Sequence, residues 1–313
     1  MSSLFMQYRL KYKKILSPTI AFVILALATG TLLVIPSLIP GSAFGQATTS
    51  MQNENNVLSN NTISYSYNIY HSNSTTNNIN LTLQKRTVSY YDNSSGYLTY
   101  PLSANNTHKQ LPAVVMIHEW WGLNEQIKKQ ADILAKEGYV VLAADLYKGQ
   151  VATDPKRAME LSSSVRNDPA SAISNLQSAV RYLKSLEMVN GSRIASLGWC
   201  FGGDWSLRLA TNSTKEDPLA ATVLYYGRPI TDSSVLSNIH WPVLGFFGDR
   251  DQSIPVQSVK EFASALNSSG TTNQIYVYRG VGHAFANPSG GNYAPNETTD
   301  AWQKTIAFLK EHL

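Results

Sequence analysis

Apolar and polar positions follow a regular pattern from residue 81 to the end of the chain. The stretches 81–91 and 96–102 flank a polar turn and predict an antiparallel pair of strands. Short apolar runs downstream predict further strands, and apolar residues three and four positions apart predict helices. The predicted strands are 113–117, 139–143, 193–197, 220–226, 242–247 and 274–279, and the predicted helices are 126–136, 170–186, 204–210, 256–267 and 298–312.

The order of these elements predicts the fold class. Strands that alternate with helices are typical of a mainly parallel central sheet with helices on both faces. The run 113–117 is apolar at every position, which is typical of a parallel strand buried on both faces. The pattern therefore predicts a single α/β domain over residues 81–313.

Residues 46–80 lack this pattern. Asn, Ser and Thr dominate the stretch, and Glu54 is its only charged residue, so we expect a flexible spacer. The apolar residues of 65–70 leave room for one short edge strand. Nine Asn-x-Ser/Thr sequences in the chain are candidate N-glycosylation sites, and chance in an Asn-rich chain is the alternative. They begin at Asn60, Asn73, Asn80, Asn93, Asn105, Asn190, Asn212, Asn267 and Asn296.

Residues 1–45 have the charge pattern of an export signal. Four basic residues and no acidic ones precede an uncharged, mostly apolar run over residues 15–39. This asymmetry places the N-terminus in the cytoplasm and the rest of the chain outside. The length of the run suits a membrane anchor, whereas Pro36, Pro40 and the small residues before Gln46 suit a cleaved signal peptide. Both alternatives remain open, and we expect a protein that is secreted or attached to the outer face of the cell membrane.

The net charge of +4 comes entirely from that N-terminal segment. Beyond it, basic and acidic residues number 21 each. A neutral domain lacks the basic surface that nucleic-acid binding requires. We therefore expect no nucleic-acid partner.

Cys200 is the only cysteine of the chain and lies in the sequence Gly198-Trp199-Cys200-Phe201-Gly202, between a predicted strand and a predicted helix. A Gly-x-nucleophile-x-Gly sequence in that context is typical of a nucleophile elbow. The sharp turn needs residues without side chains next to the nucleophile, and the helix N-terminus favours a thiolate. The alternative is a buried cysteine that serves as a small apolar residue.

A nucleophilic thiol needs a base and a group that orients the base. In α/β-hydrolases the acid and the histidine follow the nucleophile in that order, each after a later strand. Asp251 and His283 occupy these positions. Asp249 is the other candidate acid, but Asp251 suits the apex of its loop, and we expect Asp249 to brace the loop, with Arg250 or another cation as its partner.

Four separated motifs resemble those of the dienelactone hydrolase family. The segment 118–124 is similar to its E-x-x-G-x-N sequence, 145–147 to its D-L-Y, 198–203 to its cysteine elbow, and 282–285 to its G-H-x-F. The resemblance covers about residues 85–313 and implies an α/β-hydrolase fold. It also implies cleavage of a carboxylic ester or lactone through an acyl-thioester on Cys200, with no cofactor and no metal.

The resemblance assigns roles to further residues. His283 would accept the thiol proton, and Asp251 would hold the histidine tautomer. A carboxylate such as Glu119 would repel an oxyanion unless it moves away. In the family the matching glutamate contacts the resting thiol and swings away when substrate binds, which makes Glu119 a gate on the thiol. The backbone N–H groups of Trp120 and Phe201 would form the oxyanion hole.

One position departs from the family pattern. Family members that act on dienelactone bind the substrate carboxylate with arginines, one of them four residues after the histidine, where this chain has Asn287. We therefore expect a less charged ester, bound in a pocket formed by Trp120, Trp121 and Tyr226 together with Asn287. Thioesterase or other acyl-transfer activity is one alternative, and a non-catalytic cell-surface binding glycoprotein on the same fold is another.

Overall fold

A central sheet positions all the residues of interest in the computed structural model, which describes residues 56–59, 62–65, 82–106 and 110–313. Its strands follow the order β2-β1-β10-β9-β8-β7-β5-β6-β4-β3. The six strands from β10 to β6 are mutually parallel, and the two strands at each end run antiparallel to their neighbours. The strands are β1 (Asn56–Ser59), β2 (Thr62–Tyr65), β3 (Leu83–Tyr91), β4 (Ser94–Pro101), β5 (Leu111–Ile117), β6 (Val140–Ala144), β7 (Val189–Trp199), β8 (Ala221–Tyr225), β9 (Val243–Gly248) and β10 (Asn273–Tyr278).

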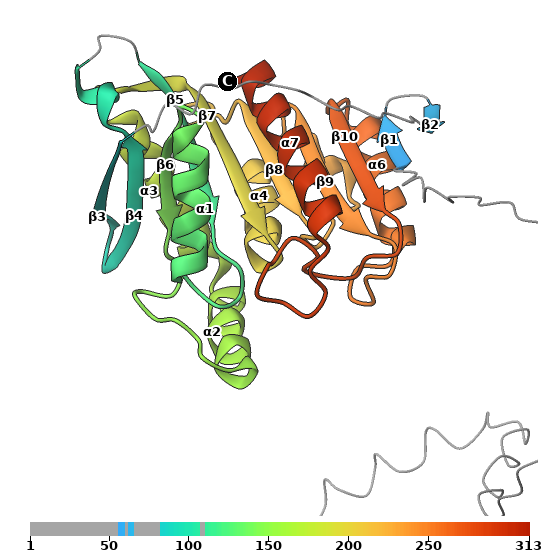
Figure 1. Cartoon of the computed structure of the whole chain (residues 1–313). Helices are drawn as coiled ribbons and strands as arrows, with labels where there is room; N and C mark the ends of the chain where they lie inside the picture. The colour runs from blue at the N-terminus through green and yellow to red at the C-terminus, as the bar shows by residue number, and fades with distance from the viewer. Residues whose placement is uncertain (1–55, 60–61, 66–81, 107–109) are drawn as a thin grey trace, which may run out of the picture. The chain divides into compact units, whose positions relative to one another are not determined.

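Helices cover both faces of this sheet (Figure 1). The helices α1 and α7 lie on one face, and α3, α4 and α6 lie on the other, while α2 projects beyond the carboxyl ends of the parallel strands. A short 3-10 helix, η1 (Leu102–Asn106), follows β4. The α-helices are α1 (Glu125–Lys136), α2 (Pro155–Asn167), α3 (Pro169–Lys184), α4 (Phe201–Thr211), α5 (Ser233–Leu236), α6 (Val256–Ser268) and α7 (Pro295–His312).

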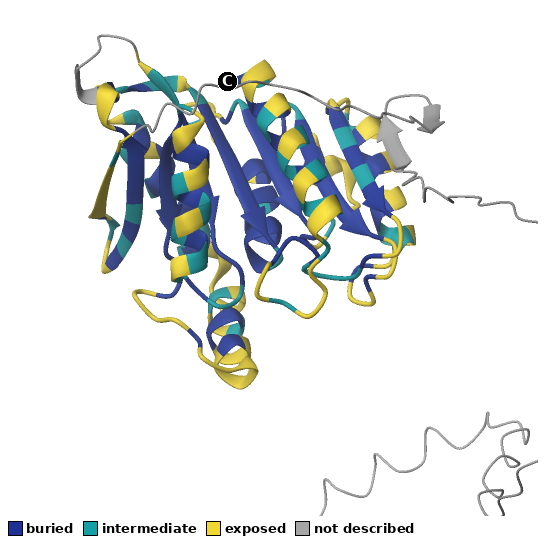
Figure 2. Ribbon diagram, in the orientation of Figure 1, coloured by how far each residue is buried: buried dark blue, intermediate teal, exposed yellow. Residues whose placement is uncertain are grey.

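The parallel strands form the core of the domain. Every residue of β6, β8 and β9 is buried, and so are the last five residues of β5. Figure 2 shows this buried sheet between helices whose outer sides are exposed. Burial of apolar side chains on both faces is the main stabilising contribution to such a sheet. The predicted fold class, an α/β-hydrolase fold with a mainly parallel sheet, is confirmed.

Most predicted elements agree with the structure within a few residues, and two helices were missed. The helix α2 buries little of its surface, since its buried residues are Ala158, Leu161 and Ser162. Its local start signal is clear, because Asp154 accepts a hydrogen bond from the N–H of Arg157 and Pro155 occupies the first turn. The same Asp-Pro signal begins α3. The short α5 also begins with an aspartate cap.

The predicted spacer and export segment fall largely outside the described residues. Within 46–80 the structure describes only β1 and β2, which form a hairpin that extends the sheet next to β10. The predicted signal peptide or anchor at 1–45 is not described. Among the residues that the structure does describe, no helix combines the length and the apolar character needed to span a membrane.

Candidate active site

Cys200 lies at the sharp turn between β7 and α4, at the carboxyl end of the sheet. Its backbone has φ 54° and ψ −116°, a conformation that a residue with a side chain adopts only under strain. A Cβ atom at Gly198 would collide with the carbonyl oxygen of Gly202. A Cβ atom at Gly202 would collide with the carbonyl oxygens of Ile117 and His118. The glycines therefore let the elbow close and let α4 approach the end of β5.

Three side chains from three loops meet at this turn. The Nε2 atom of His283 lies 3.0 Å from Sγ of Cys200, and its Nδ1 atom lies 2.7 Å from Oδ2 of Asp251. A carboxylate can only accept, so Nδ1–H is the donor to Asp251, and Nε2 faces the sulfur. The structure thus brings together the nucleophile, base and orienter that the sequence predicts.

The loop after β9 holds Asp251 in place. Its Oδ1 accepts hydrogen bonds from the backbone N–H groups of Ser253 and Ile254, and the residue is buried. The exposed Asp249 accepts a hydrogen bond of 2.6 Å from the N–H of Gly280. Asp249 therefore braces its loop against the one that carries the histidine, through a backbone N–H group.

The electrostatic setting of His283 favours its protonated form. Burial alone would lower its pKa, but the hydrogen bonds to Asp251 and Cys200 raise that pKa to about 10. An imidazolium beside the sulfur stabilises a thiolate, which is the reactive form of cysteine. The ring also meets Tyr226 edge-on, with centroids 5.2 Å apart, and this contact helps to fix its orientation.

Glu119 lies buried beside this site, bound to neutral groups. The Nδ2 atom of Asn287 donates to its Oε2 at 2.5 Å, and the hydroxyl of Tyr226 donates to its Oε1 at 3.4 Å. Burial raises the pKa of Glu119 to about 7, opposed by these two hydrogen bonds and by the charge of His283. Glu119 therefore changes its protonation state near neutral pH.

Two of the predicted pocket residues are buried and bind another residue of the protein. Tyr226 and Asn287 are almost fully buried, and their polar groups bind Glu119. Asn287 is itself held by Nε2 of Gln126, at 3.0 Å from its Oδ1. Trp120 and Trp121 are half-buried and pack edge-on, with centroids 5.0 Å apart. That these four residues contact a substrate stays a prediction.

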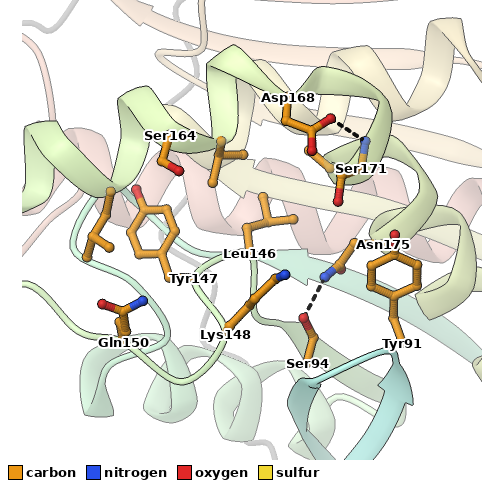
Figure 3. A pocket seen from close by; sticks show the side chains of 13 residues that line it. Tyr91, Ser94, Leu146, Tyr147, Lys148, Gln150, Ser164, Asp168, Ser171 and Asn175 are labelled. Carbon is orange, nitrogen blue, oxygen red and sulfur yellow. Dashed lines mark hydrogen bonds between the residues drawn. The ribbon is translucent and has the colours of Figure 1, made fainter.

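Two cavities of the described domain lie apart from Cys200, Asp251 and His283. One of about 310 Å³ lies between α1 and α7 and is lined in part by Trp199, Tyr225 and Trp302. The other, of about 170 Å³, lies between the β3–β4 turn, the loop after β6, and the helices α2 and α3 (Figure 3). Tyr147 lines this second cavity. Neither cavity is lined by Cys200, Asp251 or His283.

Sequence reasoning gave no role to three residues that hold the loops after β5 and β6. His118 bonds to Glu119 and Leu146, and the hydroxyl of Tyr147 donates to the carbonyl oxygen of Trp120 at 3.1 Å. The Asp145 carboxylate accepts from the N–H groups of Tyr147 and Gly149 and so shapes the loop after β6. The D-L-Y resemblance was a signal for these residues, but a motif does not show which loop it contacts.

Fold and site together define an α/β-hydrolase with a cysteine at the nucleophile position. The model of the dienelactone hydrolase family matches residues 96–313. The protein named "Protein usf" from Aquifex pyrophilus is 33% identical over 209 residues, which cover 64% of this chain and 89% of that protein. A protein of Aquifex aeolicus named "Putative carboxymethylenebutenolidase" is 29% identical over 70% of this chain and 93% of its own length.

Solved structures agree on the fold. A dienelactone hydrolase-like promiscuous phosphotriesterase from metagenomic libraries superposes with a TM-score of 0.67 at 24% identity, over 74% of this chain and 98% of that one. The chain therefore belongs to the dienelactone hydrolase family. It is an ester or lactone hydrolase of that family, as the sequence predicts.

Proposed function

We propose that the protein cleaves a carboxylic ester or lactone through an acyl-thioester on Cys200. One observation carries this proposal: a single imidazole bridges the sulfur at 3.0 Å and a buried carboxylate at 2.7 Å. That arrangement is the one that activates a nucleophile and later protonates a leaving group. Its location on a strained turn at a helix N-terminus adds support.

The reaction proceeds in two halves. In the first, the Cys200 thiolate attacks the acyl carbon, and the C–O bond of the resulting tetrahedral intermediate breaks. The leaving oxygen takes the proton from Nε2 of His283, which leaves an acyl-thioester. In the second half, Nε2 takes a proton from water as the oxygen attacks the thioester. The C–S bond then breaks, the acid leaves, and the thiolate–imidazolium pair is restored.

The oxyanion of each tetrahedral intermediate needs donors that are already in place. We assign this role to the N–H groups of Phe201 and Trp120. Phe201 is the first residue of α4, so its N–H has no partner within the helix. Trp120 lies in the loop after β5, whose backbone closely approaches the start of α4 at Gly202.

Glu119 acts as the gate on the thiol in this proposal. In the described arrangement the carboxyl group binds Asn287 and Tyr226, and the sulfur contacts His283. We assign this arrangement to the state that is ready to react, and a contact between Glu119 and the sulfur to the resting state. Glu119→Ala should then increase the rate at which hydrogen peroxide oxidises Cys200, and an unchanged rate would contradict the gate.

We further propose that the substrate is a neutral ester or lactone. The position four residues after the histidine carries Asn287, whose amide group binds Glu119 and supplies no positive charge. Neutral short-chain esters should therefore be hydrolysed faster than carboxylated lactones. Asn287→Arg should shift the preference towards carboxylated lactones. Equal or faster hydrolysis of carboxylated lactones by the natural protein would contradict the proposal.

The activity is tested with a series of p-nitrophenyl esters and lactones. The natural protein should release p-nitrophenol, and Cys200→Ala should reduce kcat to background. Mass spectrometry of a rapidly quenched reaction should show the acyl group on the peptide that contains Cys200. Turnover by Cys200→Ala comparable to that of the natural protein would overturn the mechanism.

We also propose that the protein acts outside the cytoplasm, either secreted or attached to the outer face of the membrane through residues 15–39. The charge pattern of residues 1–45 supports this proposal. Mass analysis of the mature N-terminus would distinguish cleavage from anchoring, and the same spectra would show glycans. The sequon residues Asn93, Asn212, Asn267 and Asn296 are exposed and could carry them.

A further inference from the structure

His118, the residue that follows β5, is buried and has a defined tautomer. Its Nδ1 atom lies 2.6 Å from the carbonyl oxygen of Glu119, which can only accept, so Nδ1 carries the hydrogen. Its Nε2 atom accepts a hydrogen bond of 3.2 Å from the N–H of Leu146. Burial keeps the pKa of His118 below its ordinary value, although Asp145, 4.0 Å away, opposes this. His118 is therefore a neutral donor.

The oxygen that His118 binds belongs to the peptide group between Glu119 and Trp120. The same oxygen accepts a second hydrogen bond, of 3.1 Å, from the N–H of Gly122. This peptide bond is trans and planar, so the N–H of Trp120 points opposite to the carbonyl oxygen of Glu119. Two donors on the oxygen therefore fix the direction of that N–H.

The ring of His118 also contacts the other side of the proposed oxyanion hole. It stacks on Phe201 with centroids 5.7 Å apart and an interplanar angle of 14°. It meets Tyr147 edge-on at 4.6 Å, and the Tyr147 hydroxyl binds the next carbonyl oxygen of the loop, that of Trp120. One buried ring thus touches the residue after the nucleophile and holds the loop that faces it.

We propose that His118 is a positioning residue, whose Nδ1–H bond to the Glu119 carbonyl sets the direction of the Trp120 N–H for stabilising the oxyanion. The inference rests on the proposed acyl-transfer function and deepens it. The hydrogen bond also polarises the peptide group, which makes its N–H a stronger donor. Tyr147 supports the same loop, because its ring contacts the His118 ring and its hydroxyl binds the carbonyl oxygen of Trp120.

Two reactions at the sulfur of Cys200 differ in whether they form an oxyanion. Ester hydrolysis passes through an oxyanion, whereas alkylation of Cys200 by iodoacetamide displaces iodide and forms no oxyanion. A variant that damages only the oxyanion hole should therefore lose hydrolysis and keep alkylation. A variant that damages the thiolate–imidazolium pair should lose both.

The test uses the full chain with three variants of the loop and one control. His118→Phe keeps a ring for stacking and removes both hydrogen bonds, His118→Asn restores a donor near the Nδ1 position, and Tyr147→Phe removes one hydroxyl. The control is His240→Phe at an exposed histidine between α5 and β9. Each variant is assayed for p-nitrophenyl acetate hydrolysis, for iodoacetamide alkylation and for inhibition by a trifluoromethyl ketone.

We expect His118→Phe to reduce kcat about 10- to 100-fold, less than complete loss of a donor does, with KM and the alkylation rate within about twofold of the natural protein. The inhibition constant of the ketone, which mimics the tetrahedral intermediate, should rise by the same factor as kcat/KM falls. His118→Asn should recover most of kcat. Tyr147→Phe should lose less than about tenfold, because only one weaker contact is removed.

An unchanged kcat in His118→Phe would overturn the inference and leave the Cys200 mechanism intact. A parallel loss of hydrolysis and alkylation would also overturn it, since the thiolate pair would then be the part affected. If His118→Phe does not fold, the same comparison is made on His118→Asn and Tyr147→Phe. In these two variants, a fold-decrease in the alkylation rate as large as the fold-decrease in kcat for hydrolysis contradicts the inference. Failure of the proposed function itself would show separately, as turnover by Cys200→Ala.

Discussion

Two buried carboxyl groups lie within the same site but in different surroundings. Asp251, in the loop after β9, accepts hydrogen bonds from two backbone N–H groups and from the His283 ring. The carboxyl group of Glu119, in the loop after β5, accepts from the amide of Asn287 and the hydroxyl of Tyr226. Both are about 5% exposed. Burial alone therefore does not distinguish them.

The difference shows how neighbours decide the role of a buried acid. The partner of Asp251 is His283, which carries the positive charge of the proposed thiolate–imidazolium pair, so the negative charge of Asp251 is needed there. Glu119 has neutral donors, and burial raises its pKa to about 7. The first group is built to orient the histidine. The second changes its charge near neutral pH, in the loop to which we assign one donor of the proposed oxyanion hole.

The largest expected effect tests whether Asp251 orients His283. Asp251→Asn should reduce kcat for p-nitrophenyl acetate on the order of 10³- to 10⁴-fold, because the amide no longer holds the required tautomer of His283. Asp249→Asn is the matched control, since Asp249 binds the N–H of Gly280 in the same loop, whereas Asp251 binds His283. It should lose less than about tenfold. A larger loss in Asp249→Asn than in Asp251→Asn would exchange their roles.

The next effect is on the pH dependence of stability, which depends on Glu119. The pKa of Glu119 is higher in the folded protein, about 7, than its ordinary value of 4.5. Its contribution to the free energy of unfolding is therefore fully present below about pH 4.5 and is lost as pH rises through about 7. The loss amounts to about 3 kcal/mol. Glu119→Gln cannot titrate at this position. Urea unfolding at about pH 5 and pH 8 should therefore show a smaller decrease in the free energy of unfolding for the variant than for the natural protein. Equal decreases would argue against a buried titrating Glu119.

A third effect tests whether the Glu119 charge opposes catalysis. A unit charge about 4 Å away costs roughly 1 kcal/mol in water and 4 kcal/mol near a protein surface. The ratio of kcat/KM for Glu119→Gln over the natural protein should therefore rise about tenfold between pH 6 and pH 8. The ratio removes changes with pH that both enzymes share. A ratio that stays constant with pH would show that the carboxylate lies too far from the oxyanion to matter.

The smallest effect examines the partner of Glu119. The hydrogen bond from Asn287 lowers the pKa of Glu119 and opposes burial. In an Asn287→Ala background, the midpoint of that pH-dependent ratio should therefore move upward. Ser289→Ala is the control, because its hydroxyl binds Gln126 and not Glu119. A downward shift in Asn287→Ala would show that the amide does not stabilise the charged form.

Local patterns explain why most elements and the meeting of Cys200, Asp251 and His283 could be predicted. The turn at Cys200 needs glycine at defined neighbouring positions, and the acid and histidine follow the next strands in a fixed order. The helix α2 was missed because its apolar stripe is short, although Asp154 and Pro155 mark its start. Periodicity detects buried faces, and α2 buries little.

Contacts between loops could not be predicted in the same way. Asn287 binds a carboxyl group 168 residues earlier in the chain, whereas the sequence indicated only the loss of a cation and a place in the substrate pocket. His118 meets Leu146 and Phe201 only because β5, β6 and β7 lie side by side in register. Such contacts depend on strand order, which a single sequence does not specify.

The sequence by itself determined the α/β architecture, the elbow at Cys200 and its order relative to Asp251 and His283, because each depends on residues close together in the chain or on the order of elements. The tertiary structure decided what surrounds Glu119, which tautomer His118 adopts and which loop Tyr147 holds. These are properties of burial and of hydrogen bonds between distant loops. They follow from the parallel sheet, whose carboxyl ends bring those loops to one edge.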